Sequence, residues 1–84
     1  MNTDWWVYIV ECSDESLYTG ISTDLHRRIL EHNHSKKGAK YTSNRRPVNL
    51  VYYEKLPDRS AASKREYFIK KLSRAKKLKL INSQ

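Results

Sequence analysis

Two tyrosines, an arginine and a histidine stand close together in the first part of the chain, within WWVYIVECSDESLYTGISTDLHRRILEH at residues 5–32. Tyr8 and Tyr18 fall in two neighbouring apolar segments, and Arg28 and His32 follow at a spacing of four, which places side chains on one helix face. A guanidinium can fork two hydrogen bonds to a phosphate, while a phenol or an imidazole can exchange a proton with water. If these segments fold as a hairpin and a helix, the four side chains meet on one small polar surface suited to phosphate chemistry.

Each of these residues also has a structural interpretation. Arg28 could be a surface arginine beside a helix seam, and the two tyrosines could be core aromatics with hydroxyls at the rim. As a general base, a tyrosine needs nearby cations to lower its pKa, which Arg28 and a metal ion would supply. His32 could do this work without such help. Arg27 is expected to point elsewhere and to pair with Glu31.

Glu66 is the unusual residue of the second half, because it interrupts an apolar stripe on a helix crowded with Lys and Arg. A carboxylate at the edge of a core needs a compensating cation. One interpretation is a salt bridge to a neighbouring Lys or Arg. The other is a single carboxylate ligand for a divalent ion whose remaining ligands are waters and substrate phosphate oxygens, as magnesium favours. The residues leave both interpretations open.

The elements that must position these side chains begin with a hairpin. Residues 5–12 alternate with apolar side chains on both faces, which predicts a central strand covered on two sides. Residues 17–21 form a second strand, and the polar turn at 13–16 makes the connection antiparallel. Gly20 ends this strand, where a close approach of another group is expected.

The remaining segments predict a helix over 25–34, capped by Ser22, Thr23 or Asp24, a helical turn over 39–43, a third strand over 48–56 and a long helix over 60–81. On the long helix, the stripe predicted to be apolar runs through Ala61, Phe68, Leu72 and Ala75, with Ala62 and Ile69 beside it. The order strand, strand, helix, short helix, strand, helix predicts one small α+β domain over residues 1–84.

Composition indicates the kind of partner. Seventeen Lys and Arg against nine Asp and Glu give a net charge of +8, which attracts polyanions and favours nucleic acid, although charge of this kind can also serve solubility alone. The basic segments 36–46 and 64–79 are candidate surfaces for a nucleic-acid backbone or simply solvated faces. The single Cys12 excludes a disulfide within the chain, and with no leader or membrane-length apolar run we expect a cytoplasmic protein that does not enter a membrane.

This pattern resembles the GIY-YIG nuclease superfamily over nearly the whole chain, from residue 5 to about residue 80, and within it the small single-domain bacterial branch of UPF0213-like proteins. The matching positions are Trp6-Val7-Tyr8 in place of the first triplet, Tyr18-Thr19-Gly20 in place of the second, then Arg28, His32 and Glu66, with GAKYT at 38–42. Trp6 and Val7 replace the first Gly-Ile, and Ile21 stands where some relatives carry a lysine. The tyrosines and Gly20 are intact.

The resemblance implies a three-stranded antiparallel sheet flanked by helices, and hydrolysis of a nucleic-acid phosphodiester with one Mg²⁺ or Mn²⁺ ion. Tyr8 and Tyr18 would orient or deprotonate the attacking water with help from His32, Arg28 would hold the scissile phosphate, and Glu66 would bind the metal ion. Gly20 would let the hairpin approach the site. The residues expected to contact nucleic acid beside the site are Lys40, Tyr41, Thr42, Arg45 and Arg46.

The sequence therefore predicts a metal-dependent endonuclease that acts on DNA in repair or processing. Branched or damaged DNA is a candidate substrate, and RNA is left open. Relatives often carry a separate DNA-binding domain, so a partner protein for targeting is a further expectation. Two other hypotheses stand beside it: a nucleic-acid-binding module with this fold but little or no catalysis, and a protein-interaction domain with an incidental basic surface.

Overall fold

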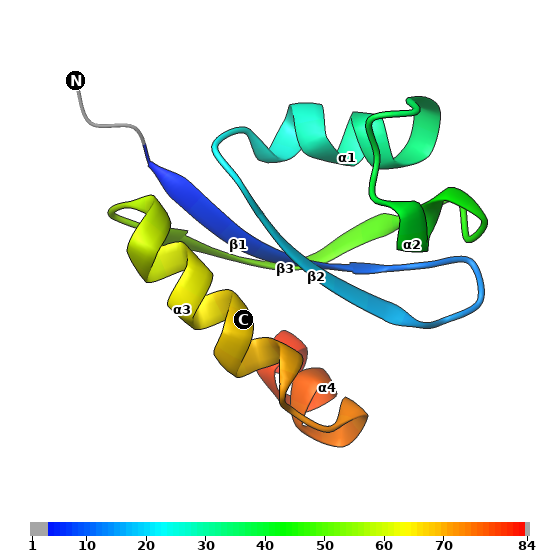
Figure 1. Ribbon diagram of the computed structural model, residues 1–84. Helices are drawn as coiled ribbons and strands as arrows, with labels where there is room; N and C mark the ends of the chain where they lie inside the picture. Colours follow the sequence, from blue (N-terminus) through cyan, green and yellow to red (C-terminus); the bar gives the residue numbers. More distant parts are fainter. Residues whose placement is uncertain (1–3, 84) are drawn as a thin grey trace.

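A three-stranded antiparallel sheet in the order β2-β1-β3 lies between two pairs of helices (Figure 1). The computed structural model describes residues 4–83. Its elements in chain order are β1 (Trp5–Glu11), β2 (Leu17–Ser22), α1 (Leu25–His34), α2 (Lys40–Ser43), β3 (Asn49–Leu56), α3 (Arg59–Lys70) and α4 (Arg74–Asn82). The predicted α+β fold and its antiparallel sheet are confirmed.

Strand β1 is the central strand, as its two apolar faces predicted. On one face Val7 and Ile9 are completely buried together with Ile69 of α3. On the other face Tyr8 and Val10 are buried, with Leu25 and Ile29 of α1 among the residues that pack over them. Because side chains of a strand alternate between its faces, a strand covered on both sides needs apolar residues at every position.

Helix α1 has the predicted bounds, and local hydrogen bonds explain both its start and its attachment. The Asp24 side chain accepts the backbone N–H of Arg27 at 3.0 Å, which satisfies a donor at the helix start. Near the other end, the Asn33 side chain donates to the Val48 carbonyl at 3.0 Å and accepts the Val48 N–H at 2.7 Å. This pair of bonds ties α1 to the residue that precedes β3.

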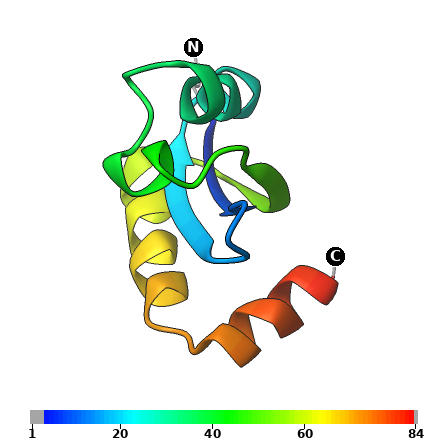
Figure 2. The same ribbon diagram turned by 90° about the vertical axis from the view of Figure 1, so that its right-hand side faces the viewer.

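The helix predicted over 60–81 is in fact two helices, α3 and α4, and Figure 2 shows α4 leaving the line of α3 at an angle. Ser73 caps the second helix by accepting the backbone N–H of Lys76 at 3.2 Å. A serine at a helix start competes with the continuous helical hydrogen-bond pattern. The break lets Leu80 and Ile81 fold back and pack on the core cluster that contains Ile69.

The apolar stripe predicted for the long helix was wrong, because Phe68 and Ala75 of that stripe are exposed. Ala62 and Ile69 are fully buried, whereas Phe68 is 53% exposed. Two neighbouring stripes of this helix are apolar enough to pack, and contact with Val7 and Ile9 of β1 selects the one that carries Ile69. Among the residues that the structure describes, no helix combines the length and the apolar character needed to cross a bilayer.

Candidate active site

The Tyr8 side chain lies directly over Gly20 of the neighbouring strand. A Cβ atom built on Gly20 would be 2.5 Å from the Tyr8 hydroxyl oxygen and 2.7 Å from its Cζ atom, so any larger residue would displace the phenol. The close approach expected at Gly20 is therefore present. Because Gly20 lies in an edge strand, the Tyr8 hydroxyl reaches the border of the sheet, where helices on both faces can approach it.

A buried chain of hydrogen bonds begins at this hydroxyl. The Tyr8 oxygen is 2.7 Å from His32 Nε2, and His32 Nδ1 is 2.9 Å from Thr42 Oγ1. The Thr42 hydroxyl donates in turn to the Ala39 carbonyl at 2.9 Å. Tyr8, His32 and Thr42 are all at most 1% exposed. The chain links β1 through α1 to the short helix α2.

The hydrogen-bond network assigns the tautomer of His32. A threonine hydroxyl has one proton, and since Thr42 gives it to Ala39, its oxygen must accept from the imidazole Nδ1–H. Nε2 then carries the lone pair and accepts the Tyr8 O–H. The opposite tautomer would use the Ala39 N–H as donor to Nδ1, a contact of 3.4 Å that is longer than the one to Thr42. We therefore assign the shorter contacts: Tyr8 is the donor and His32 is the acceptor.

Arg28 lies at the edge of the buried face, as predicted, and not out in solvent. Its side chain is 24% exposed, and Nη1 donates to Glu31 Oε1 at 3.1 Å and to the Lys37 carbonyl at 2.8 Å. A further hydrogen bond joins it to Tyr8. Burial acts to lower the pKa of the Arg28 guanidinium, but the bonds to Glu31 and Tyr8 outweigh it and raise that pKa. The guanidinium is a fixed positive charge beside Tyr8.

The pKa values of Tyr8 and His32 move away from neutrality, contrary to expectation for both. Burial raises the pKa of Tyr8 to about 12, even though the hydrogen bond from Arg28 acts in the lowering direction. Burial also lowers the pKa of His32 to about 4, and the positive charge of Arg28 adds to this effect. Burial disfavours the charged form of either group. At neutral pH the site thus holds a neutral phenol that donates to a neutral imidazole.

Glu66 reaches the same site from α3, on the opposite face of the sheet from α1. Its negative charge is the smallest contribution to the raised pKa of Tyr8, so the carboxylate acts on the phenol through space. The side chain is 23% exposed, and Oε2 lies 3.4 Å from Nζ of Lys70. The salt bridge considered from the sequence is present, and the carboxylate remains partly exposed.

The donor set limits what kind of metal site is feasible. Among residues 4–83, no group of three or more His, Cys, Asp or Glu side chains is arranged to hold a metal ion. A zinc site of the usual kind, with three or four protein ligands, does not fit. A magnesium or manganese ion held by the Glu66 carboxylate, with water and phosphate oxygens as other ligands, fits the residues present.

Tyr18 belongs to the same cluster through its ring. It packs edge-on against the His32 imidazole, with ring centroids 5.5 Å apart, and stacks on Tyr41 at 5.7 Å. The Arg45 guanidinium lies 4.1 Å from the centroid of the Tyr41 ring and pairs with Asp14 at 3.0 Å. Tyr18 and Tyr41 therefore cover the buried imidazole from outside.

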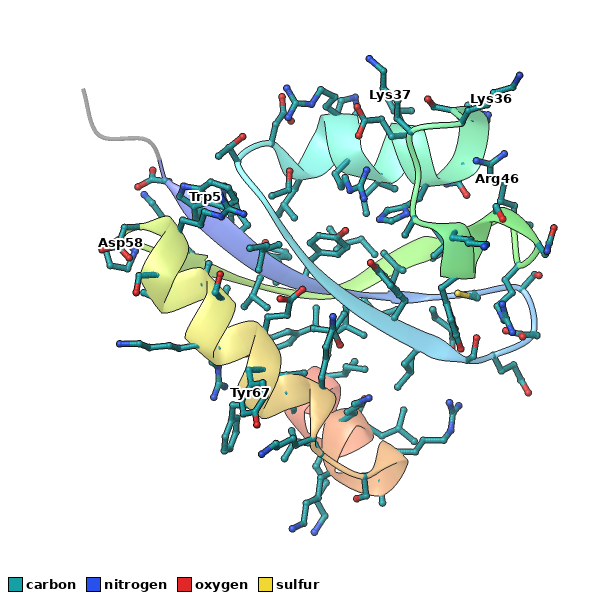
Figure 3. The ribbon with its side chains drawn as sticks, viewed as in Figure 1. Trp5, Lys36, Lys37, Arg46, Asp58 and Tyr67 are labelled. Atoms are coloured by element: carbon teal, nitrogen blue, oxygen red, sulfur yellow. The ribbon has the colours of Figure 1, made fainter. Side chains whose placement is uncertain are left out.

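The residues expected to contact nucleic acid differ in their exposure and in their contacts within the protein. Arg46 donates to the carbonyls of His32 and Ser35 and so binds the C-terminal end of α1, where Figure 3 shows it. Thr42 is fully buried and has no surface to offer a nucleic acid, which corrects its expected role. Lys40 and Tyr41 are exposed, and for them nucleic-acid contact stays a prediction.

The bond from Thr42 to His32 is the functional contact that sequence reasoning missed. Thr42 lies ten residues from its partner, and its motif GAKYT only indicated a position beside the site. Gly38 of the same motif is the clearest signal, because a Cβ there would be 2.7 Å from the Glu31 carbonyl oxygen and 2.9 Å from the His32 Cα. The motif has to pack closely on α1, and this packing brings Thr42 to His32.

Comparison with known proteins identifies the relatives of this chain. The chain is 61% identical over 79 residues to a UPF0213 protein of Desulfotalea psychrophila, a match covering 94% of this chain and 72% of that protein. It is 58% identical over 80 residues to a UPF0213 protein of Haloquadratum walsbyi, covering 95% and 89% respectively. The solution structure of a UPF0213 protein from Bacillus halodurans is 47% identical, with a TM-score of 0.63, covering 96% of this chain and 85% of that one.

A second solution structure, of a protein from E. faecalis, is 39% identical with a TM-score of 0.65 and covers 99% of this chain and 90% of that one. The family model of the GIY-YIG catalytic domain matches residues 4–79, which include every residue of the site described above. The chain therefore belongs to the GIY-YIG nuclease superfamily and, within it, to the small UPF0213 family.

Proposed function

We propose that this protein is a divalent-metal-dependent endonuclease that hydrolyses phosphodiester bonds of DNA, in repair or processing. The observation that carries the proposal is the buried hydrogen bond between Tyr8 and His32. The Arg28 guanidinium also bonds to Tyr8, and the charge of Glu66 acts on the same phenol. This combination supplies a proton acceptor, a fixed cation and a carboxylate around one point. Membership of the nuclease superfamily supports the same reaction class.

The proton path follows from the direction of the hydrogen bonds. A water beside Tyr8 gives a proton to the phenol oxygen while Tyr8 passes its own proton to His32 Nε2. The hydroxide so formed bonds to the phosphorus atom as the bond from phosphorus to the leaving oxygen breaks, the leaving oxygen takes a proton from solvent, and His32 later returns its proton to solvent. Neither a free phenolate nor a charged imidazole is present beforehand, because the two pKa values lie at about 12 and about 4. A bound phosphate would favour the imidazolium, since a nearby negative charge raises the pKa of a histidine. Substrate binding would thus strengthen the base.

Arg28 would stabilise negative charge on the phosphate oxygens. A guanidinium has five N–H donors; Nη1 makes the bonds to Glu31 and Lys37, and one further donor serves Tyr8, so donors remain for a phosphate. The bonds to Glu31 and Lys37 also hold it in place before the substrate arrives, so little reorganisation is needed during the reaction.

Glu66 would hold the divalent ion, Mg²⁺ or Mn²⁺, in exchange for its contact with Lys70. When bound, such an ion supplies Lewis-acid stabilisation of the leaving oxygen. The Lys70 ammonium lies 3.4 Å from the carboxylate and would move away as the ion arrives.

The test is cleavage of a panel of end-labelled substrates: linear duplex, branched and damaged DNA, single-stranded DNA and RNA, each with Mg²⁺, Mn²⁺ or EDTA. We expect metal-dependent cleavage of DNA, and its loss in both Glu66→Gln and Arg28→Ala while circular dichroism shows an unchanged fold. Arg27→Ala is the matched control, because Arg27 lies on the same helix with a side chain 60% exposed and should leave cleavage intact. Full cleavage by purified Glu66→Gln would refute the assignment.

One observation favours a second candidate function, a nucleic-acid-binding module without catalysis. In the structure Lys70 already neutralises the carboxylate that the ion requires. That function would give salt-sensitive binding with no metal-dependent nicking of any substrate in the panel.

A further inference from the structure

The net charge of the molecule is confined to its last two helices. Residues 59–83, which form α3, α4 and the turn between them, carry nine Lys and Arg and a single acidic residue, Glu66. The rest of the chain carries eight basic and eight acidic residues, which cancel. The whole charge of +8 therefore lies in this segment.

The two parts also differ in how their charges are paired. Before α3, ion pairs such as Arg45–Asp14 at 3.0 Å and Lys55–Asp4 at 3.1 Å neutralise cations locally. Within the described residues, the cations of α3 and α4 form two ion pairs, Arg65 with Glu54 and Lys70 with Glu66. The other cations of these two helices therefore produce a positive electrostatic potential, which attracts polyanions.

The orientation of α3 determines which of its cations lie beside the candidate active site. Ala62 and Ile69 point into the sheet, and Arg65 turns to Glu54 on β3. Since the sheet order is β2-β1-β3, the opposite flank of α3, which carries Glu66, lies towards β2 and Gly20. With 100° between successive helical residues, Arg59 and Lys70 fall on the flank of Glu66, about 20° and 40° from it, and Tyr67 follows beyond Lys70 towards solvent.

These residues are available at the surface. Tyr67 is 63% exposed and points outward from α3 in Figure 3, and the Lys71 ammonium lies 4.3 Å from the centroid of its ring. The Arg59 guanidinium lies 5.8 Å from the centroid of the Trp5 ring, at the end of α3 where Figure 3 shows Trp5 and Asp58. From Arg59 to Lys70 the helix spans about 16 Å, long enough to follow several phosphates of one strand.

We propose that Arg59, Tyr67 and Lys70, named here the α3 track, bind the nucleic-acid strand that leads to the scissile phosphate. The inference rests on the proposed function for the position of that phosphate. The cations contact backbone phosphates, and the exposed face of Tyr67 stacks on a base where the strand is unpaired. Glu66 lies between Arg59 and Lys70 on this flank, so a strand held along α3 by the two cations passes the carboxylate that would hold the ion.

The test measures binding without cleavage. All variants are made in a Glu66→Gln background and kept in EDTA, and the affinity for a labelled DNA duplex is measured by fluorescence anisotropy over a salt series. The track variant is Arg59→Ala with Lys70→Ala. The control is Lys64→Ala with Lys79→Ala, which removes the same charge, one residue from α3 and one from α4, away from the Glu66 flank.

We expect the track variant to lower the slope of log affinity against log salt by about 1.8, which is about 0.9 for each phosphate contact, and the control to lower it much less. Equal losses in the two variants would show that only the overall field acts, and would overturn the inference, as would no loss in the track variant. The result does not depend on cleavage, so the track can fail while the nuclease assignment stands, and the reverse.

Tyr67 is tested separately with single strands. Tyr67→Ala should weaken binding of single-stranded DNA by about tenfold, and binding of duplex much less, because one base loses its stacking partner. Phe68→Ala is the control, since Phe68 is 53% exposed on the same helix but lies towards Arg65, 5.2 Å from its guanidinium. Single-stranded RNA is the third probe and shows whether the track prefers deoxyribose. Equal effects of the two aromatic variants would contradict the stacking role.

Discussion

The two parts of this small protein handle polar groups in opposite ways. In the part before α3, charges cancel and the groups of the candidate site are buried and bonded to one another, as in the chain from Tyr8 through His32 to Thr42. In α3 and α4 the charges accumulate with one sign and point to solvent. The difference suggests two separate roles. Burial sets the protonation states of Tyr8 and His32, and the exposed cations of α3 and α4 attract a polyanion.

The largest expected effect comes from removing the Tyr8 hydroxyl. Tyr8→Phe keeps the ring over Gly20 but removes the group that accepts the proton from water and passes one to His32, so we expect a 10²- to 10⁴-fold lower single-turnover cleavage rate. Tyr53→Phe is the matched control, because it removes a phenol that is 48% exposed on β3 and belongs to neither the candidate site nor the α3 track, and it should leave the single-turnover rate unchanged. If both variants cleave at the parent rate, the buried network has no role in the chemistry.

The second prediction concerns pH. The folded-state pKa of His32, about 4, lies below the ordinary value of 6.5. Between pH 4 and pH 6.5, His32 is therefore protonated in the unfolded chain and neutral in the folded protein. Stability gained from this group is complete above pH 6.5 and is lost as the pH falls towards 4, by up to about 3 kcal/mol. Urea unfolding across this range measures the loss, and an NMR titration should show no protonation of His32 above pH 5. Protonation near pH 6.5 would mean that the imidazole is not buried in solution.

The third prediction tests the tautomer. Thr42→Val keeps the shape of the side chain but leaves the His32 Nδ1–H without its acceptor, which should lower the free energy of unfolding by about 1–3 kcal/mol. Thr42→Ser retains the hydroxyl and should largely restore it. The ¹⁵N chemical shifts of the imidazole should show Nδ1 protonated in the parent and in the serine variant. A parent with the proton on Nε2 would reverse the donor and acceptor roles assigned to Tyr8 and His32.

The smallest effect is expected in the exposed part. Ser73→Ala removes the N-cap of α4 and should lower the free energy of unfolding by about 1 kcal/mol. Ser63→Ala, an exposed serine within α3, should not destabilise the protein, since alanine is the better helix former. Thermal or urea unfolding of the two variants compares them directly. A Ser73→Ala variant as stable as the parent would indicate that packing of Leu80 and Ile81 alone holds α4 in place.

Much of this structure was determined by the sequence over short distances. The alternation of apolar residues specified β1 as a central strand, the polar residues Ser22, Thr23 and Asp24 marked the start of α1, and the motif residues identified the superfamily. These features depend on neighbours in the chain, since strand period, capping and turn formation are local properties.

Only the tertiary structure decided the environment of those side chains. Burial moved the pKa values of Tyr8 and His32 away from neutrality. From the residue types alone, we expected pKa values closer to neutral pH for both groups. Packing also assigned Thr42 to His32 and selected the buried stripe of α3. A pKa and a hydrogen-bond partner depend on atoms that are distant in sequence and close in space, so they are settled only when the chain has folded.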